Sequence, residues 1–470
     1  MFFSNSGLRI FAVATILGLA FSLGWQTRAQ AFFFGGVSIR DEKEMGKKFD
    51  TLVRSHMPVI EDPEIRQYAD DVLKKLLKGV PRQPYNFKTS VILNNSHNAF
   101  AIPGGYTYIF TGLLMNLDSE EELAGIMAHE LAHVTQRHVA ARMDRAQFFT
   151  LGSLLVAIAG IALAGPGGAA AAVTAAGAGQ SAMLNYSRID ESDADTLGLQ
   201  YLTAAGYPPQ GMIGGFKALR QKNWMSGVNI PTYLSTHPAI GDRINNISAR
   251  VAAMPDAKKN AKTDNSRFNR VKTLLWARYG DERAALRKFS GGDGLSLMGK
   301  GVVLSRMNKT KEATAAFDSA LKRSPRDPLI LREAGIFHFR KGDMSRAERL
   351  LGQAMSADPR DYMASFFYGR VLDETGGEKR APQYYRDVLR RVPEEAEVHR
   401  AFARSLGKAG DESQAYIHLA YAEIYDNNKK MAEKYFKRAE ALAGKTADKK
   451  PFDKLKAVYE ERKKMWDGAK

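Results

Sequence analysis

The chain has 470 residues, more than one hydrophobic core usually holds, so two domains and a connector are expected. It contains no cysteine, which excludes disulfide frameworks, thiolate metal sites, iron–sulfur clusters and a cysteine nucleophile. Lysine and arginine exceed aspartate and glutamate by 68 to 51, a net charge of +17, and residues 261–470 carry +14 of it. This basic half suits nucleic acid, anionic lipid or acidic protein, and charge alone does not choose among them.

The first 31 residues are typical of a secretory signal peptide. Met1–Arg9 carries one basic side chain, Ile10–Trp25 is an uncharged, mostly apolar run, and Ala29-Gln30-Ala31 is a small-x-small cleavage pattern. An uncleaved membrane anchor is the alternative, because the apolar run is slightly long. We expect a mature chain that begins at Phe32 and works outside the cytoplasm, so nucleic acid is not expected as a partner.

A helix and a small sheet are predicted next. Asp62 is a helix N-cap before Pro63, and apolar residues follow at helical spacing to about residue 80. Asn86–Leu93 is a short run rich in β-formers, and the turn Pro103-Gly104-Gly105 separates two further runs within residues 98–111. These runs predict a hairpin or a small sheet.

The next predicted helix opens at Asp118, runs to about Met143 and contains His129-Glu130-Leu131-Ala132-His133. Residues i and i+4 share a helix face, so both imidazoles reach one metal ion, and Glu130 stands beside them to take a proton from water. The pattern arises by accident in roughly one sequence in a hundred of this composition. The alternative is a structural helix with two surface histidines.

No Asp, Glu, Lys or Arg occurs from Ala146 to Ser187. The first part of this stretch, Phe148–Ala164, could barely span ~25 Å as a helix, and the second part is rich in alanine and glycine. We predict a hairpin that lies over the first domain or against a membrane surface. A transmembrane pair is the alternative.

A third metal ligand is expected downstream, because a zinc hydrolase uses three protein ligands and keeps a fourth position for water. No His-x-x-Gly-x-x-His continuation follows His133, so a carboxylate is favoured. Glu191 and Asp195 share one face at the start of the next predicted helix. Glu191 is the predicted ligand, while Asp195 either accepts a hydrogen bond from a ligating imidazole or donates a proton at the metal. An ordinary acidic residue in a first turn is the alternative for Glu191.

The second half repeats every 34 residues after a polar, apolar-poor stretch at Lys258–Ser266. Small residues and prolines keep this step, as in Gly301, Gly335, Gly369 and Ala403, in Ala313, Ala347, Ala381 and Ala415, and in Pro325, Pro359 and Pro393. Small residues are needed where two helices approach closely, so the period predicts an α-solenoid of stacked helix pairs. Such arrays usually present a binding surface, and a solenoid without a specific partner is the alternative.

The motif His129-Glu130-x-x-His133, followed by Glu191-x-x-Ala194-Asp195, resembles the M48 family of zinc metallopeptidases. Asn98–Gly105 before Gly112-Leu113-Leu114 resembles the pattern that precedes the motif in that family, and the 34-residue period resembles tetratricopeptide repeats. The likeness covers nearly the whole mature chain. The expected fold is mainly α with a small β-sheet, a zincin-like metallopeptidase domain followed by an α-solenoid of tetratricopeptide-type repeats.

The domains expected on this resemblance are a signal peptide at 1–31, an M48-like zinc metallopeptidase domain at 32–257 with the uncharged hairpin at 146–187, a linker and helix at 258–290, and a repeat domain at 291–470. The resemblance implies that His129, His133 and Glu191 bind one Zn²⁺ ion, that Glu130 is the catalytic base and that Asp195 is the second active-site acid.

The sequence also resembles latent members of the family, in which a histidine on a loop after the site is an extra zinc ligand. His237, in Ser235-Thr236-His237-Pro238, matches that position, and an ordinary surface-loop histidine is the alternative. Arg243, six residues on, is a candidate oxyanion donor.

Relatives that join an M48 domain to such repeats imply a periplasmic zinc metalloendopeptidase for quality control and assembly of outer-membrane proteins. Unfolded or misassembled proteins are the expected substrates. The repeats are expected to bind these substrates or the outer-membrane assembly machinery. Contact of the protein with a membrane surface is a further possibility that the sequence leaves open. The alternative is mainly a chaperone or scaffold with a latent metallopeptidase site. A membrane-embedded peptidase is excluded, because multiple long apolar spans are missing.

Overall fold

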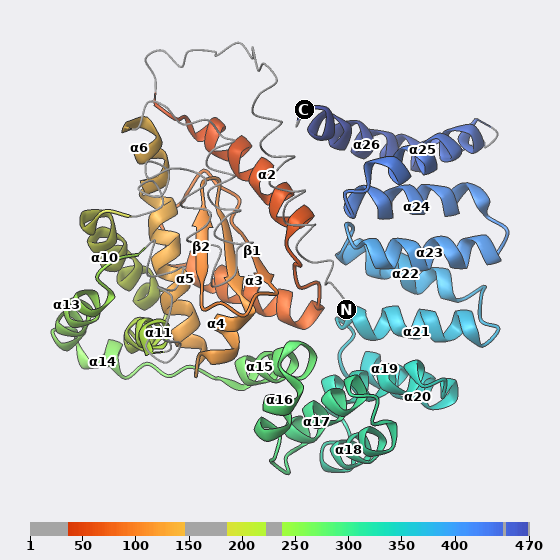
Figure 1. Cartoon of the computed structure of the whole chain (residues 1–470), viewed down its shortest axis with the longest axis horizontal. Helices are drawn as coiled ribbons and strands as arrows, with labels where there is room; N and C mark the ends of the chain where they lie inside the picture. The colour runs from red at the N-terminus through yellow and green to blue at the C-terminus, as the bar shows by residue number, and fades with distance from the viewer. Residues whose placement is uncertain (1–35, 146–185, 222–236, 445–447, 469–470) are drawn as a thin grey trace, which may run out of the picture.

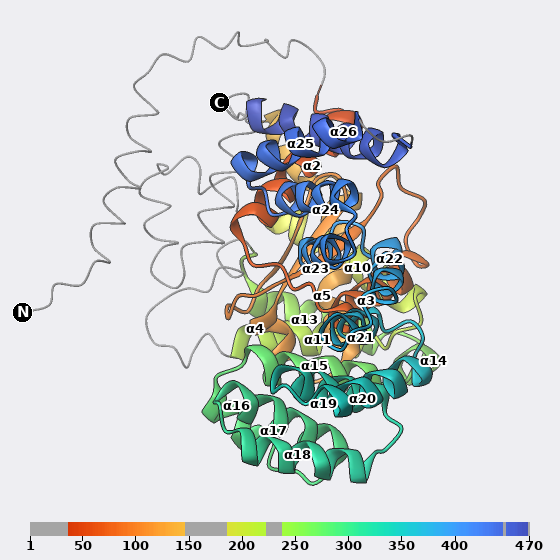
Figure 2. The same cartoon turned by 90° about the vertical axis from the view of Figure 1, so that its right-hand side faces the viewer.

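The computed structural model describes residues 36–145, 186–221, 237–444 and 448–468. Figure 1 shows two bodies side by side, a small sheet wrapped by helices and a column of stacked helices from the second half of the chain. Figure 2, turned by 90°, shows the column running along the sheet-containing body. The predicted signal peptide at 1–31 and nearly all of the hairpin at 146–187 lie outside the described residues. Among the described helices, none has the length and apolar character needed to cross a membrane.

The sheet has three short strands, β1 (Lys88–Ile92), β2 (Ala99–Ile102) and β3 (Tyr106–Phe110), in the order β1-β3-β2. Strands β2 and β3 form the predicted antiparallel hairpin. Gly104 and Gly105 make its turn with φ values of 87° and 93°, in the left-handed region that glycine enters without strain. Strand β1 joins the other side of β3 in parallel, so β2 is left at an edge of the sheet.

Helices cover this sheet, and α5 is the central one because every residue from 123 to 134 is buried. In chain order the helices of this body are α2 (Ile39–His56), α3 (Pro63–Leu77), α4 (Thr111–Asn116), α5 (Glu120–Thr135), α6 (His138–Arg145), α10 (Arg188–Ala204), α11 (Gln210–Gln221), α13 (Ile240–Ala252) and α14 (Asp256–Lys259). Helices α10 and α11 pack along α5. A Cβ atom on Gly125 would lie 2.5 Å from the Met212 Cα, so the glycine permits this close approach of α5 and α11.

Helix α5 ends earlier than the sequence predicts. The expected helix ran to about Met143, whereas α5 stops at Thr135, Arg137 adopts the left-handed conformation with a φ of 54°, and α6 begins at His138. The Arg137 guanidinium donates to the Glu42 carboxylate and to a backbone carbonyl near the start of α2. A tertiary contact therefore stabilises the break, and helical periodicity does not record such a contact.

The second body is the predicted stack of helix pairs. Its helices are α15 (Ser266–Tyr279), α16 (Glu282–Lys288), α17 (Gly294–Arg306), α18 (Thr310–Arg323), α19 (Pro328–Arg340), α20 (Met344–Ala357), α21 (Tyr362–Glu374), α22 (Ala381–Arg391), α23 (Ala396–Lys408), α24 (Glu412–Tyr425), α25 (Lys429–Ala443) and α26 (Lys450–Gly468). Glycines at the 34-residue step each face a large side chain 16 residues later, in the pairs Gly301 with Phe317, Gly335 with Leu351 and Gly369 with Tyr385. The period thus places a small residue where the two helices of each pair touch.

Helix α15 joins the two bodies through a shared core. The Phe268 ring lies 6.4 Å from the ring of Tyr68 on α3, and both side chains are buried. The Trp276 indole donates to the Met115 carbonyl of α4 at 3.0 Å. One cluster of buried apolar residues runs through α3, α5, α15 and the repeats. The helix that follows the polar stretch is therefore part of the core of the molecule.

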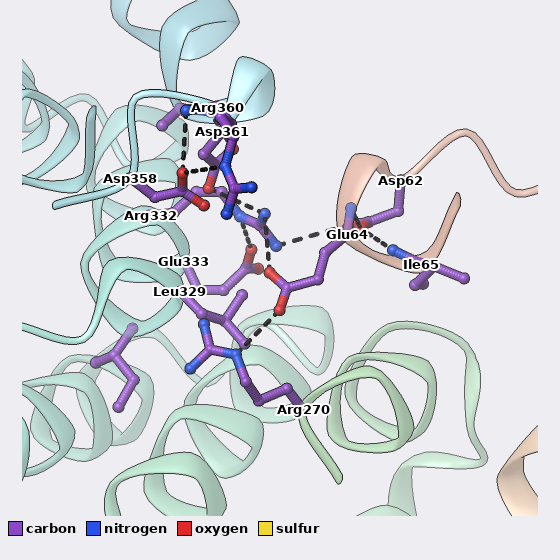
Figure 3. A network of polar contacts seen from close by, with 12 residues as sticks. Asp62, Glu64, Ile65, Arg270, Leu329, Arg332, Glu333, Asp358, Arg360 and Asp361 are labelled. Atoms are coloured by element: carbon purple, nitrogen blue, oxygen red, sulfur yellow. Dashed lines mark hydrogen bonds and ion pairs between the residues drawn. The ribbon is translucent and has the colours of Figure 1, made fainter. Parts of the chain in front are cut away.

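Buried charges make a second contact between the bodies (Figure 3). Arg332 of α19 is 1% exposed, although a charged side chain is costly to bury unless it is paired. Its guanidinium forms ion pairs with Asp62 at 4.0 Å, Glu64 at 3.6 Å, Glu333 at 2.9 Å and Asp361 at 3.1 Å. Asp62 is also the N-cap of α3, as the sequence predicts, so one cluster of charges connects α3 with α19 and α21.

The C-terminal end of the column, at α26, contacts the sheet-containing body again. Lys47 of α2 forms an ion pair with Glu461 of α26, and the Thr51 hydroxyl lies 3.7 Å from the Met465 sulfur. Figure 1 shows this approach of α26 to α2 at the top of the molecule. The column of repeats therefore contacts the sheet-containing body at both ends, near α3 and near α2.

Candidate metal centre

Helix α5 brings the ring nitrogens of the two motif histidines close together. His129 and His133 are fully buried, and their Nε2 atoms lie 3.0 Å apart. The spacing of one helical turn, i to i+4, produces this approach. Two unprotonated ring nitrogens at this distance can both direct their lone pairs at one shared cation.

Two more donors come from α10 and from His237, three residues before α13. Glu191 lies in the first turn of α10, which Ser187 caps. Its carboxylate oxygens lie 3.5 Å from the His133 Nε2 and 3.6 Å from the His129 Nε2. His237 Nδ1 lies 2.8 Å from the Glu191 Oε1 and 3.4 Å from the His129 Nε2. The structure therefore brings all four predicted ligand residues together.

These four side chains fit a metal ion. One ligand atom from each of His129, His133, Glu191 and His237 lies within 4.8 Å of the others, and all four residues are buried. Imidazole nitrogen and carboxylate oxygen are ligands that zinc takes, and four is its usual coordination number. Burial, together with the neighbouring imidazoles, lowers the pKa of His133 well below its ordinary value, so its ring is neutral, as ligation requires.

Glu130 lies beside this group and against the sheet edge. Its Oε2 accepts a hydrogen bond from the Ala101 backbone N–H of β2 at 3.2 Å, and its Oε1 lies 3.7 Å from the His237 Nε2. Burial, assisted by the negative charge of Glu191, raises the pKa of the Glu130 carboxyl to about 7. A carboxyl group with this pKa exchanges protons near neutral pH, as a general base or acid requires.

Asp195 and Arg243 form a layer behind the ligands. Asp195 Oδ1 lies 3.0 Å from the His129 Nδ1, whereas the other three predicted ligand residues lie near the other ring nitrogen, Nε2. Arg243 donates to both Asp195 oxygens, at 2.9 and 2.7 Å, forms an ion pair with Glu191 and stacks over the Phe216 ring. Although burial opposes it, hydrogen bonding from Arg243 lowers the pKa of Asp195 to about 2, so this carboxylate is ionised. The role of Arg243 as an oxyanion donor stays a prediction.

The sequence around this site matches a known peptidase family. Residues 60–251 match the model of peptidase family M48, and residues 298–354 and 338–396 match a tetratricopeptide repeat model. Residues 60–251 are therefore an M48 peptidase domain. This M48 domain holds every predicted site residue, and tetratricopeptide repeats follow it, as the sequence indicates.

The chain has similar relatives among known proteins. A protein of Vibrio cholerae is 33% identical over 260 residues, 54% of this chain and 53% of its own length. The beta-barrel assembly-enhancing protease of Escherichia coli K12 is 34% identical over 217 residues, 44% of this chain and 43% of its own. The chain spans about half the length of these curated relatives. A solved structure of MamA covers 34% of this chain and 97% of its own at 22% identity, with a TM-score of only 0.29.

Two side chains at the M48 site were not predicted from the sequence. The Tyr186 ring lies 3.7 Å, centroid to centroid, from the His133 ring, and the His138 Nδ1 lies 2.9 Å from the His133 Nδ1. Tyr186 lies at the end of the long uncharged stretch and has no motif around it. His138 is five residues after His133, a spacing that points to a different face of an unbroken helix. Only the break at Arg137 reveals its position.

Proposed function

We propose that the protein is a zinc-dependent endopeptidase. The observation that carries the proposal is the convergence of His129, His133, Glu191 and His237 on one buried point beside Glu130, within an M48 domain. A bound zinc ion supplies a Lewis acid for the peptide carbonyl and lowers the pKa of water to about 7. One ion per chain is proposed, because the described residues contain one such group.

Glu130 is the proposed catalytic base. The Ala101 N–H holds one of its oxygens, and the other faces the ligand group. With a pKa of about 7, the carboxylate takes a proton from the attacking water and returns it to the leaving amine. Strand β2 is the sheet edge next to Glu130, so an extended chain that pairs with it would lie along the site. Main-chain pairing suits unfolded or strand-like substrates.

Asp195 is proposed as the second active-site acid. Because Asp195 is ionised, it is better suited to accept a hydrogen bond that orients the His129 ring than to donate a proton. Arg243 neutralises the two carboxylates that it bridges, Asp195 and Glu191. A role as oxyanion donor requires its guanidinium to reach the substrate while it keeps these contacts.

The proposed setting is the periplasm, in assembly and quality control of outer-membrane proteins. Support comes from the name of the Escherichia coli relative, a beta-barrel assembly-enhancing protease, and from the signal-peptide pattern at residues 1–31. The tetratricopeptide repeats would dock unfolded clients or the assembly machinery, because stacked helix pairs offer an extended surface for protein partners.

A second candidate function is a chaperone or scaffold whose peptidase site is latent. His237 favours it, because the ring is only 2% exposed and its Nδ1 is in the ligand group. A histidine there occupies the fourth position that a catalytic zinc site keeps for water. Client binding by the repeats would not depend on that position.

Zinc analysis and casein cleavage test the proposal. Wild type and Glu130→Gln are both expected to hold one zinc ion per chain, since Glu130 is not a ligand. Glu130→Gln should cleave casein at least about 100-fold more slowly, because an amide cannot accept the proton. Turnover of Glu130→Gln within about tenfold of wild type would contradict Glu130 as the base. Zinc in wild type without cleavage by either protein would favour the latent chaperone.

A further inference from the structure

We propose that His138 is a positioning residue that holds the His133 ring in its metal-binding orientation. The inference rests on the proposed metal site and concerns the one ring nitrogen of His133 that does not face it. His133 Nε2 points toward the His129 Nε2 and the Glu191 carboxylate, at 3.0 and 3.5 Å. Its Nδ1 points the other way and meets the His138 Nδ1 at 2.9 Å.

The proton positions in this pair follow from the chemistry of a ligating imidazole. A neutral ring that binds a metal through Nε2 carries its proton on Nδ1. The His133 Nδ1–H therefore donates to the His138 Nδ1, which must be an unprotonated acceptor. His138 is then neutral, with its own proton on Nε2. Metal-bound histidines usually donate to a carboxylate, a backbone carbonyl or water, and here a second imidazole takes that place.

The backbone conformation between α5 and α6 brings His138 to this position. In an unbroken helix, a residue five positions after His133 would lie on a different face. The left-handed conformation of Arg137, which non-glycine residues rarely adopt, turns the chain so that α6 starts beside the end of α5. Two hydrogen bonds from the Arg137 guanidinium, to Glu42 and Val37, hold the turn. Such strain is typical of functional sites.

The His133 ring is thereby constrained on two sides. His138 holds its Nδ1, and the Tyr186 ring packs against it with centroids 3.7 Å apart. His138 is 7% exposed, so water does not readily replace its acceptor nitrogen. Removing an outer-shell partner of this kind typically lowers metal affinity by about 10- to 100-fold.

The test compares two variants of the full chain with the same side-chain shape. Asparagine places its Oδ1 about where the histidine Nδ1 lies, whereas leucine has nearly the same shape as asparagine and no acceptor. Zinc affinity is measured by competition with a chromophoric chelator. His138→Leu should bind zinc about 10- to 100-fold more weakly than wild type, and His138→Asn should stay close to wild type. Equal affinities for the two variants would overturn the proposal, because a packing role alone does not distinguish them.

A control tests whether weaker zinc binding by His138→Leu could result from disrupting any buried pair of histidines. His399 and His418 in the repeats form a similar contact, Nδ1 to Nδ1 at 2.8 Å, far from the metal group in sequence. His399→Leu should leave zinc affinity unchanged, and an equal loss in this variant would overturn the assignment to His138. If wild type itself binds no zinc, the proposed function fails. Wild-type zinc binding with no difference between His138→Leu and His138→Asn refutes only the positioning role.

Discussion

At the scale of single residues, Glu191 shows how one carboxylate completes a set of imidazoles. It reaches both His129 and His133 from a different helix, and its neighbour two positions on, Asp193, is exposed. We expect Glu191→Ala to lose zinc, because the ligands on rigid helices fall from three to two. Metal analysis after dialysis measures this, with Asp193→Ala as the matched control from the same helical turn. Full zinc occupancy in Glu191→Ala would show that Glu191 is not the third ligand and would favour His237 or Asp195 in that role.

His237 is the residue whose substitution separates the two candidate functions. If its ring blocks the fourth position, His237→Ala should raise casein cleavage above wild type and promote self-cleavage, with zinc still bound by His129, His133 and Glu191. If the ring is instead a donor to the oxyanion, the same variant should be slower. Cleavage rates at equal zinc content decide between these roles. No change in rate would make His237 an ordinary loop residue.

At the scale of elements, Arg332 ties the start of α3 to α19 and α21. Although burial opposes it, the positive charges of Arg278 and Arg332 lower the pKa of Glu333 to about 2. A depressed carboxyl pKa stabilises the fold above the unfolded value, and that stabilisation is lost as the pH falls through the folded value. Removing Arg332 should raise the folded pKa of Glu333, which keeps its ion pair with Arg278. It should also take from the Asp361 carboxylate the guanidinium that lies 3.1 Å from it.

We therefore expect Arg332→Met to lower the free energy of unfolding by about 3–5 kcal/mol, the usual cost of breaking a buried ion pair from one side. The midpoint of acid unfolding should also move to higher pH. Urea and acid titrations followed by circular dichroism measure both effects. Arg360→Met is the control, because the Arg360 side chain is 88% exposed and pairs only with Asp358 among the described residues. Equal stability of the two variants would show that the buried cluster does not hold the elements together.

At the scale of the whole molecule, the position of α15 determines where the chain can be divided. Phe268, Val271 and Leu274 of this helix are buried in the core that includes α3. A chain that ends at residue 258 would expose their partners, at about 1.5–3 kcal/mol per side chain. We expect that shorter chain to aggregate or melt at a lower temperature than one that ends at residue 324, which keeps α15 to α18.

The chain that ends at residue 324 should still bind zinc and cleave casein. If the later repeats bind outer-membrane assembly proteins or their stalled clients, this shorter chain should no longer co-purify with them. Zinc content, casein cleavage and co-purification are measured side by side with the full chain. Retained co-purification would place the docking surface in the first body or the first repeat pair.

The sequence by itself determined the features that depend on local spacing. The i, i+4 histidines of α5 and the small residues at every 34th position follow from the geometry of one helix or of one helix pair, so the fold class could be predicted. Glu191 could be proposed because a zinc site needs a third ligand and an acidic helix start follows. The structure places it with His129 and His133.

Only the tertiary structure decided the features that depend on contacts between distant segments. The parallel pairing of β1 with β3, the break at Arg137, the layer of Asp195 and Arg243, and the burial of Arg332 all join residues far apart in the chain. Arg332 has the sequence context of any polar helix residue, and Arg137 lies within an unbroken helical pattern. Their roles arise because packing, rather than local propensity, selects which charges are buried and where a helix ends.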